Sequence, residues 1–118
     1  MKRSEAGAKA EQLAADFLSA RGLTILRRNV RTRFGELDLI ARDGDTLVFV
    51  EVRLRQKQAF GGAAASITPA KQARMIASAR IYLASLRSEP ACRFDAVLLD
   101  ALDAKSIDWR RNVIEGAG

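Results

Sequence analysis

The sequence contains no histidine and a single cysteine, Cys92. Without histidine there is no Ser-His-Asp or Cys-His nucleophilic pair, no histidine-rich zinc site and no imidazole general base. Cys92 has no second cysteine for a disulfide and no neighbour at metal-ligand spacing, so we expect a buried, inert thiol. Any chemistry is therefore left to carboxylates, lysine and arginine, which keeps hard cations open as cofactors.

Long apolar runs are also missing. No uninterrupted run approaches the roughly 20 apolar residues that span a bilayer, and the positively charged start of the chain is not followed by the apolar segment of a secretory signal. We therefore expect a cytoplasmic protein that does not bind membranes. Its 118 residues, 48% of them hydrophobic, can build one core, so we expect a single domain over residues 1–118.

Positive charge exceeds negative charge, with 20 Lys and Arg against 14 Asp and Glu, as is typical of proteins that bind polyanions. The charges are unevenly distributed. Residues 21–35 carry five arginines and no acid, whereas residues 36–51 carry five acids and one base. The sequence therefore predicts a basic rim beside an acidic patch. Charged residues that only face solvent would give the same distribution. The candidates for a phosphate-binding rim are Arg27, Arg28, Arg31 and Arg33.

The periodicity of apolar residues predicts two helices. The first begins at the N-cap Ser4 and stops at Gly22, which takes the C′ position. The second is capped by Thr68, has Pro69 at its first position and continues to about Arg87.

Strands are expected over residues 23–30, 36–41, 46–53, 93–99 and 107–113, with residues 60–66 as a loop. The second and third strands form a hairpin, because Asp43, Gly44 and Asp45 supply turn residues between them. Residues 47–50 are apolar on both faces, which predicts a sheet covered by helices on both sides. Trp109 is expected in the core.

Acidic residues fall on one face of each hairpin strand. Glu36 and Asp38 share a face of the first strand, and Glu51 and Arg53 share a face of the second. A two-residue hairpin loop at Asp43 and Gly44, or a four-residue loop over 43–46, places Asp38 and Glu51 on the same side. With the four-residue loop they stand directly opposite each other, with Cβ atoms about 4.5–5.5 Å apart. A three-residue loop would separate them.

Two carboxylates on a half-buried face raise each other's pKa unless a cation lies between them. Mg²⁺ or Mn²⁺ would satisfy such a pair, because hard cations take oxygen ligands. Arg53 could then reach the phosphate of a substrate. A salt bridge among Asp38, Glu51 and Arg53 that merely closes the sheet explains the spacing equally well.

The segment from Gly35 to Arg55 resembles the signature of the YraN family, bacterial proteins assigned to the PD-(D/E)xK endonuclease-like superfamily. The resemblance extends to Gly7 and Glu11, to residues 67–71 and to residues 93–97. It implies an α/β fold with a restriction-endonuclease-like αβββαβ core, in which helices flank a central mixed sheet. Archaeal Holliday-junction resolvases have a similar core.

The resemblance also implies roles for individual residues. Asp38 and Glu51 match the catalytic acids of the motif, and Arg53 matches its lysine. Glu11 matches a helical acid that joins Asp38 and Glu51 as a ligand of Mg²⁺ or Mn²⁺. Lys71 or Gln72 falls where related nucleases place an additional polar residue.

Arginine at the lysine position changes the chemistry. A guanidinium with a pKa above about 12 cannot act as a base at neutral pH, but it can clamp a phosphate oxygen. Lys71 lies in the first turn of the second helix, where a cation opposes the helix dipole, so a compensating partner is expected there, and a phosphate would supply one.

Three functions remain open. The first is a metal-dependent nuclease for structured or branched DNA, for which a homodimer would suit a substrate with two strands to cut. The second is a catalytically inactive nucleic-acid-binding accessory protein of repair or recombination that keeps the nuclease fold. The third is an interaction protein whose acidic cluster is purely structural and binds no metal.

Overall fold

The computed structural model describes residues 4–55 and 67–114, so the expected loop over residues 60–66 lies outside the described part. The order of elements is the one that the resemblance implies, followed by a single-turn 3-10 helix and a fifth strand. The elements are α1 (Glu5–Ala20), β1 (Thr24–Thr32), β2 (Gly35–Asp43), β3 (Thr46–Leu54), α2 (Pro69–Ala84), β4 (Cys92–Leu99), η2 (Ala104–Ser106) and β5 (Ile107–Arg110).

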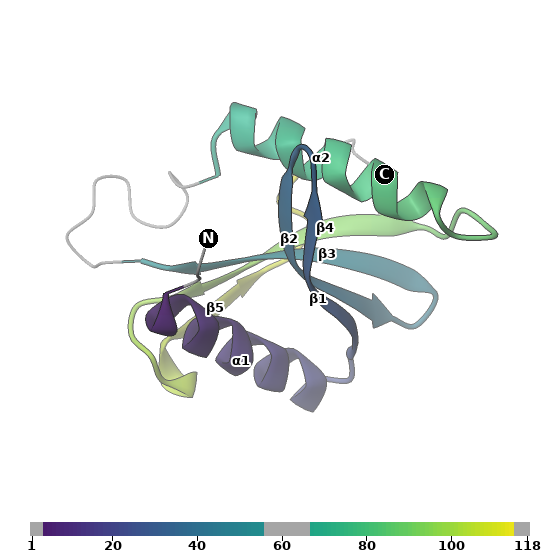
Figure 1. Ribbon diagram of the computed structural model, residues 1–118. Helices are drawn as coiled ribbons and strands as arrows, with labels where there is room; N and C mark the ends of the chain where they lie inside the picture. The colour runs from purple at the N-terminus through teal and green to yellow at the C-terminus, as the bar shows by residue number, and fades with distance from the viewer. Residues whose placement is uncertain (1–3, 56–66, 115–118) are drawn as a thin grey trace.

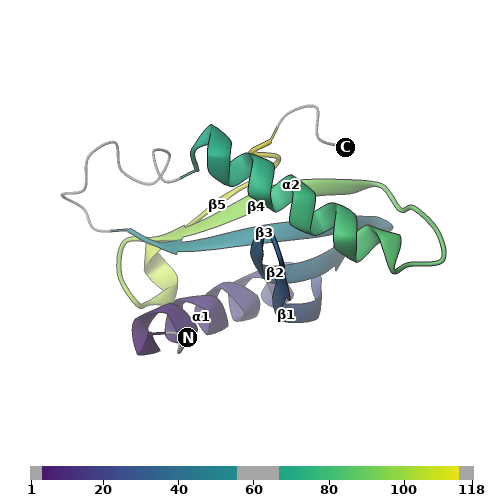
Figure 2. The ribbon, with the colours of Figure 1, turned by 45° about the horizontal axis from the view of Figure 1, so that its top comes forward.

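The five strands form one mixed sheet in the order β1-β2-β3-β4-β5. Strands β3 and β4 are parallel and are connected through α2, whereas the other neighbours are antiparallel. Helix α1 covers one face of the sheet and α2 the other (Figure 1), and the view in Figure 2 shows the same two layers. The predicted α/β fold with a central mixed sheet is confirmed. Neither helix in the described part is long and apolar enough to cross a bilayer.

The core consists of two apolar layers, one on each face of the sheet. Side chains of β2 and β3 alternate between the layers, so the prediction that β3 is buried on both faces is confirmed. The layer under α1 includes Ala14, Leu18, Leu39, Val48 and Val50. The layer under α2 includes Ile40, Phe49, Met75, Ala79 and Phe94.

Helix α1 begins and ends where the sequence predicts. The Ser4 hydroxyl accepts a hydrogen bond from the Gly7 N–H at 2.9 Å. At the other end Gly22 has a φ of +95°, and the N–H groups of Gly22 and Leu23 donate to the carbonyls of Ser19 and Leu18. This is a Schellman motif, which needs a left-handed residue at C′ and therefore favours glycine.

Helix α2 is shorter than predicted. Thr68 and Pro69 open it as expected, but it ends at Ala84 and not near Arg87. The Ser85 hydroxyl donates to the Tyr82 carbonyl at 2.6 Å and so satisfies one of the last free carbonyls of the helix. The apolar stripe continues past this end, because Leu86 still packs against the layer under α2.

The hairpin between β2 and β3 has a loop of two residues, Gly44 and Asp45, closed by the pair Asp43 and Thr46. Gly44 has a φ of +60°, as a tight hairpin turn requires. Leu39 pairs with Val50, which is the register predicted for the four-residue loop. The observed loop is shorter because Asp43 and Thr46, the ends of that predicted loop, also pair with each other. Continued by one residue, this register places Asp38 opposite Glu51.

The last strand is shorter than the predicted residues 107–113. It stops at Arg110, and Asn112 has a φ of +58° that breaks the extended backbone. Asp95, which is fully buried, accepts hydrogen bonds from the Asn112 N–H at 2.9 Å and from Trp109 Nε1 at 3.0 Å. Trp109 packs edge-on against Phe17 and against the layer under α1, but it is only partly buried, so it lies at the edge of the core, whereas it was predicted within it.

Cys92 is half-buried at the start of β4, and not fully buried as expected. Burial, together with the charge of Glu89, raises the pKa of its thiol. The thiol is therefore less reactive than a free cysteine in water, as the sequence suggests.

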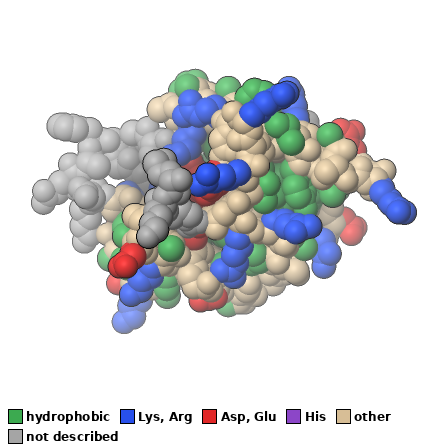
Figure 3. All heavy atoms as spheres, in the orientation of Figure 1, with side chains coloured by type: hydrophobic (Ala, Val, Ile, Leu, Met, Phe, Trp, Pro, Cys, Tyr) green, Lys and Arg blue, Asp and Glu red, His purple; other side chains and the backbone are tan. Residues whose placement is uncertain are grey.

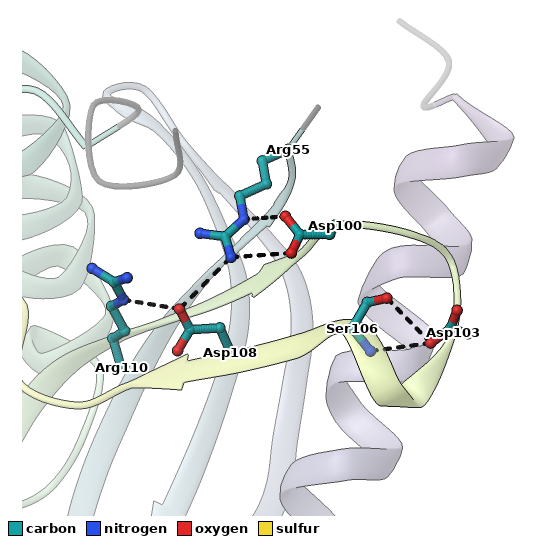
Figure 4. A network of polar contacts seen from close by, with 6 residues as sticks. All are labelled: Arg55, Asp100, Asp103, Ser106, Asp108 and Arg110. Atoms are coloured by element: carbon teal, nitrogen blue, oxygen red, sulfur yellow. Dashed lines mark hydrogen bonds and ion pairs between the residues drawn. The ribbon is translucent and has the colours of Figure 1, made fainter. Parts of the chain in front are cut away.

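An ion-pair network holds the end of β3 (Figure 4). The Arg55 N–H donates to the Leu99 carbonyl at 2.8 Å, and the Arg55 guanidinium pairs with Asp100 and, at 3.9 Å, with Asp108 on β5. Strand β3 is thus tied to β4 and β5 just beyond Arg53, which fixes the backbone that carries Arg53.

Candidate functional site

A pocket of about 370 Å³ lies between α1, β2, β3 and α2. In the space-filling view, parts of acidic side chains show beside Lys and Arg side chains near the middle of this face (Figure 3). Apolar and small residues from both helices complete the wall. The charged residues that line the pocket are Glu11, Glu36, Asp38, Glu51, Arg53, Lys71 and Arg74.

Asp38 reaches this pocket because β2 parts from β3 at this residue. The hydrogen-bonded ladder ends at the pair Leu39 and Val50, and the Val52 N–H donates at 2.8 Å to Asp38 Oδ2 in place of a strand carbonyl. Leu37 and Leu39 pack into opposite apolar layers although they are two residues apart. In a regular strand they would share a face, so β2 twists sharply around Asp38.

Asp38 and Glu51 come together on the same side of the sheet. Burial, the hydrogen bond that it shares with Glu51 and the charge of Glu51 raise the pKa of Asp38 to about 9, with a smaller contribution from Glu11 and an opposing one from the Val52 N–H. At neutral pH and without a cation, Asp38 therefore keeps its proton and Glu51 lies beside it.

Glu51 is held by two cations. It is only 5% exposed, and its Oε2 lies 2.5 Å from Lys71 Nζ and 3.2 Å from Arg53 Nη2. These are ion pairs and not aligned hydrogen bonds, because Oε2 has no partner in hydrogen-bond geometry. Glu51 is thus the compensating partner that was expected for Lys71 in the first turn of α2.

A second group of acids adjoins the first. Carboxylate oxygens of Glu11, Glu36 and Asp38 all lie within 4.8 Å of one another. Asn29 Nδ2 donates to Glu11 Oε1 at 2.8 Å and to Glu36 Oε1 at 3.1 Å. Three carboxylates at this spacing form an oxygen-rich donor set of the kind that Mg²⁺ and Mn²⁺ prefer.

Glu36 and Asn29 were not selected as site residues from the sequence. For Glu36 a signal existed, because it shares the strand face of Asp38. Asn29 has a φ of +52°, a conformation that asparagine adopts more readily than most residues. Nothing in the local sequence distinguishes this asparagine from one in an ordinary turn.

The four arginines of β1 and its turn do not form one row. Arg28 pairs with Leu39 and donates at 2.7 Å to Gln12 of α1. Arg27 pairs with Ile40, which belongs to the opposite apolar layer. Arg31 Nε lies 3.5 Å from Glu36 Oε2, and Arg33 is exposed in the turn after β1.

Comparisons with known proteins find similar sequences that share one family name. Residues 10–99 match the sequence model of the "Uncharacterised protein family UPF0102". The chain is 53% identical over 109 residues to a UPF0102 protein of Nitrosospira multiformis and 55% identical over 109 residues to one of Nitrosomonas europaea, with 92% of each chain covered in both cases. A UPF0102 protein of Herminiimonas arsenicoxydans is 48% identical over 113 residues, which are 96% of this chain and 89% of that protein.

Proposed function

This chain belongs to the UPF0102 family, the YraN family that its signature resembles, and we propose that it is a divalent-metal-dependent nuclease acting on structured or branched DNA. The observation that carries the proposal is the convergence of four acids and two cations from four elements on one pocket. The acids are Glu11, Glu36, Asp38 and Glu51, and the cations are Arg53 and Lys71.

The acids fit a divalent cation. Glu11, Glu36 and Asp38 already have oxygens within 4.8 Å of one another. Burial first, and then the neighbouring Glu51, raises the pKa of Asp38, and a cation would stabilise its ionised form. Asp38 would give up its proton on binding, since a ligating carboxylate must be ionised. A bound Mg²⁺ or Mn²⁺ would lower the pKa of a water molecule and neutralise charge on the phosphate under attack.

Arg53 is placed to bind that phosphate. Its Nε is buried and makes no hydrogen bond with the residues that the structure describes, while its Nη2 lies near Glu51. A phosphate oxygen in the pocket would satisfy this N–H, and the guanidinium would stabilise the charge that develops there. This agrees with the role of a clamp, and not of a base, for an arginine at this position.

Lys71 fills the role of the motif lysine that Arg53 cannot fill, which is to orient the attacking water molecule. Its ammonium group lies 2.5 Å from Glu51 Oε2 and has three donors, so it can hold both Glu51 and a water molecule. A water molecule between Lys71 and the acids would be oriented toward the phosphate. The two functions of the motif lysine are therefore divided between Lys71, which orients the water, and Arg53, which binds the phosphate.

The net charge of +6 supports a polyanionic substrate. The described part of the chain contains no helix or ribbon with the features of a base reader, so we propose recognition of DNA by shape and backbone charge. A substrate with two strands to cut would suit a homodimer.

The test is an incubation of the purified protein with Mg²⁺ or Mn²⁺ and a panel of branched, single-stranded and duplex DNA. Cleavage should fall at least about 100-fold in Asp38→Asn and Glu51→Gln, as for the loss of a group that stabilises the transition state. Glu5→Gln, an exposed acid of α1 outside the pocket, is the matched control. Absence of cleavage across the panel would overturn the proposal, and cleavage that survives Glu51→Gln would belong to a contaminant.

One observation favours the second function, DNA binding without turnover. Lys71 and Arg53 already neutralise Glu51 without a metal ion, so the pocket has one acid fewer to offer as a ligand. Binding of branched DNA without cleavage in either metal would identify this accessory role.

A further inference from the structure

The turn between β1 and β2 carries an exposed aromatic ring. Among residues 4–55 and 67–114, five aromatic residues make ring-to-ring contacts with one another: Phe17, Phe49, Tyr82, Phe94 and Trp109. The sixth, Phe34, is 41% exposed. The Arg33 guanidinium lies 5.1 Å from the centre of its ring. Phe34 is therefore an exposed apolar plane with a positive charge beside it.

This turn is fixed to α2. The Thr32 hydroxyl donates to the Gly35 carbonyl at 3.1 Å and accepts from the Phe34 N–H at 3.0 Å. It also bonds at 2.7 Å to the hydroxyl of Ser78, which is 1% exposed on α2. A buried side chain on a helix thus orients the backbone that presents Phe34, and little further ordering is needed when a ligand binds.

The turn also adjoins the acidic pocket. Gly35 and Glu36 line that pocket, and a neighbouring groove of about 320 Å³ is lined by Arg31, Thr32, Gly35 and Glu36. Phe34 lies two residues from Glu36, which is at most about 7 Å of chain. The turn that carries Phe34 therefore borders the pocket in which we propose that a phosphate binds.

We infer that Phe34 stacks on an unpaired base beside the phosphate bound in the acidic pocket. This inference rests on the proposed nuclease function and narrows its substrate to DNA with an unstacked nucleotide, such as a bulge or a branch point. In a continuous duplex the neighbouring base pairs cover both faces of each base and leave no face for Phe34. Arg31 and Arg33 supply charge for the phosphates on either side of that nucleotide.

The test measures binding by fluorescence anisotropy in Ca²⁺ with two labelled DNA probes. One is a duplex with a single bulged 2-aminopurine, and the other is the same duplex without the bulge. Phe34→Ala should weaken binding of the bulged probe by about 5- to 100-fold, the usual effect of removing one base-stacking aromatic. It should leave the continuous duplex within about twofold of wild type.

Two further variants and a second readout separate stacking from a general loss of structure. Phe34→Trp should retain tight binding of the bulge, because indole also stacks. Ile81→Ala removes a side chain that is likewise 41% exposed but belongs to α2 and not to the turn between β1 and β2, and it should leave both affinities unchanged. Emission of 2-aminopurine, which stacking quenches, should fall with wild type and Phe34→Trp but not with Phe34→Ala.

The outcomes distinguish this inference from the proposed function. If wild type cleaves DNA in Mg²⁺ while Phe34→Ala behaves like Ile81→Ala on both probes, the stacking role is overturned and the nuclease remains. Equal losses on both probes in Phe34→Ala would also overturn it. If wild type neither binds nor cleaves any probe, the proposed function fails and this inference fails with it.

Discussion

Lys71 Nζ, in the first turn of α2, lies 2.5 Å from Oε2 of the buried Glu51 on β3. The contact spans the connection between the parallel strands β3 and β4, so it joins the helix above the sheet to the acidic end of the central hairpin. Two consequences follow. The buried side chain of Glu51 has a cationic partner, and a lysine is available at a site whose motif position holds Arg53.

The Glu51 and Lys71 pair should be measurable as a coupling energy. Lys71→Met leaves a buried carboxylate with one cation fewer, and we expect its free energy of unfolding to fall by about 1–3 kcal/mol. In Glu51→Gln the same lysine substitution should cost less, because no charge is stranded. The measurement is urea denaturation of wild type, both single variants and the double variant. Strictly additive effects would show that the two side chains do not interact.

Stability should fall as the pH rises, because of Asp38. The native carboxyl keeps its proton to about pH 9, whereas an ordinary aspartate loses it near 3.8. Between these values the native state binds more protons than the unfolded state, so the free energy of unfolding decreases with pH. We expect a loss of roughly 1–3 kcal/mol between pH 6 and pH 8.

The control for this pH dependence is Asp38→Asn, which has no proton to lose at this position. Its free energy of unfolding should change less over the same pH range. Saturating Mg²⁺ should also reduce the loss in wild type, because a cation stabilises the ionised carboxyl. If the free energy of unfolding changed equally with pH in wild type and Asp38→Asn in metal-free buffer, the expected proton on native Asp38 would be contradicted.

Asn29 should tune the affinity for the cation without binding it. Its amide donates to both Glu11 and Glu36, and removal of a group that orients metal ligands typically weakens metal binding about 10- to 100-fold. The suitable variant is Asn29→Gly, because glycine keeps the left-handed backbone at φ +52° without strain. Titration with Mn²⁺ followed by calorimetry gives the dissociation constants. An unchanged constant in Asn29→Gly would show that the amide does not position the acids.

Asp95 should be essential for folding and not for chemistry. It is fully buried and accepts from Arg93, Trp109 and the Asn112 backbone. Asp95→Asn removes the negative charge beside the half-buried Arg93, which keeps Asp43 as a partner, and leaves an amide to replace the carboxylate that accepts from Trp109 and Asn112. This should lower the free energy of unfolding by about 1–3 kcal/mol. Asp45→Asn in the exposed hairpin loop is the control and should change it by less than about 0.5 kcal/mol. The measurement is thermal unfolding of the two variants. Equal stability would show that Asp95 is not important for the fold.

The parts of the fold that local chemistry determines could be predicted from the sequence. Ser4, Thr68 and Pro69 start the helices as expected, and Gly22 ends α1. The opposing positions of Asp38 and Glu51 followed from side-chain alternation and a short loop rich in turn residues. The family signature gave the order of elements.

The remaining features depend on contacts between residues far apart in the sequence. One such feature is the end of the pairing between β2 and β3 at Leu39, beyond which the Asp38 carboxyl accepts from the Val52 N–H of β3. The partner of Lys71 could not be identified, because its approach to Glu51 depends on how α2 lies over the sheet. Arginines 27, 28, 31 and 33 were grouped by their closeness in the sequence. That grouping did not include the alternation and twist of β1, which place Arg27 and Arg28 on opposite faces.

The most direct test of a single cation centre at Asp38 is calorimetric titration of Mg²⁺ near pH 7.5 in two buffers of different ionisation enthalpy. The account predicts saturable binding to wild type with release of about one proton from Asp38, and neither binding nor proton release for Asp38→Asn. Equal heats in the two proteins would contradict it.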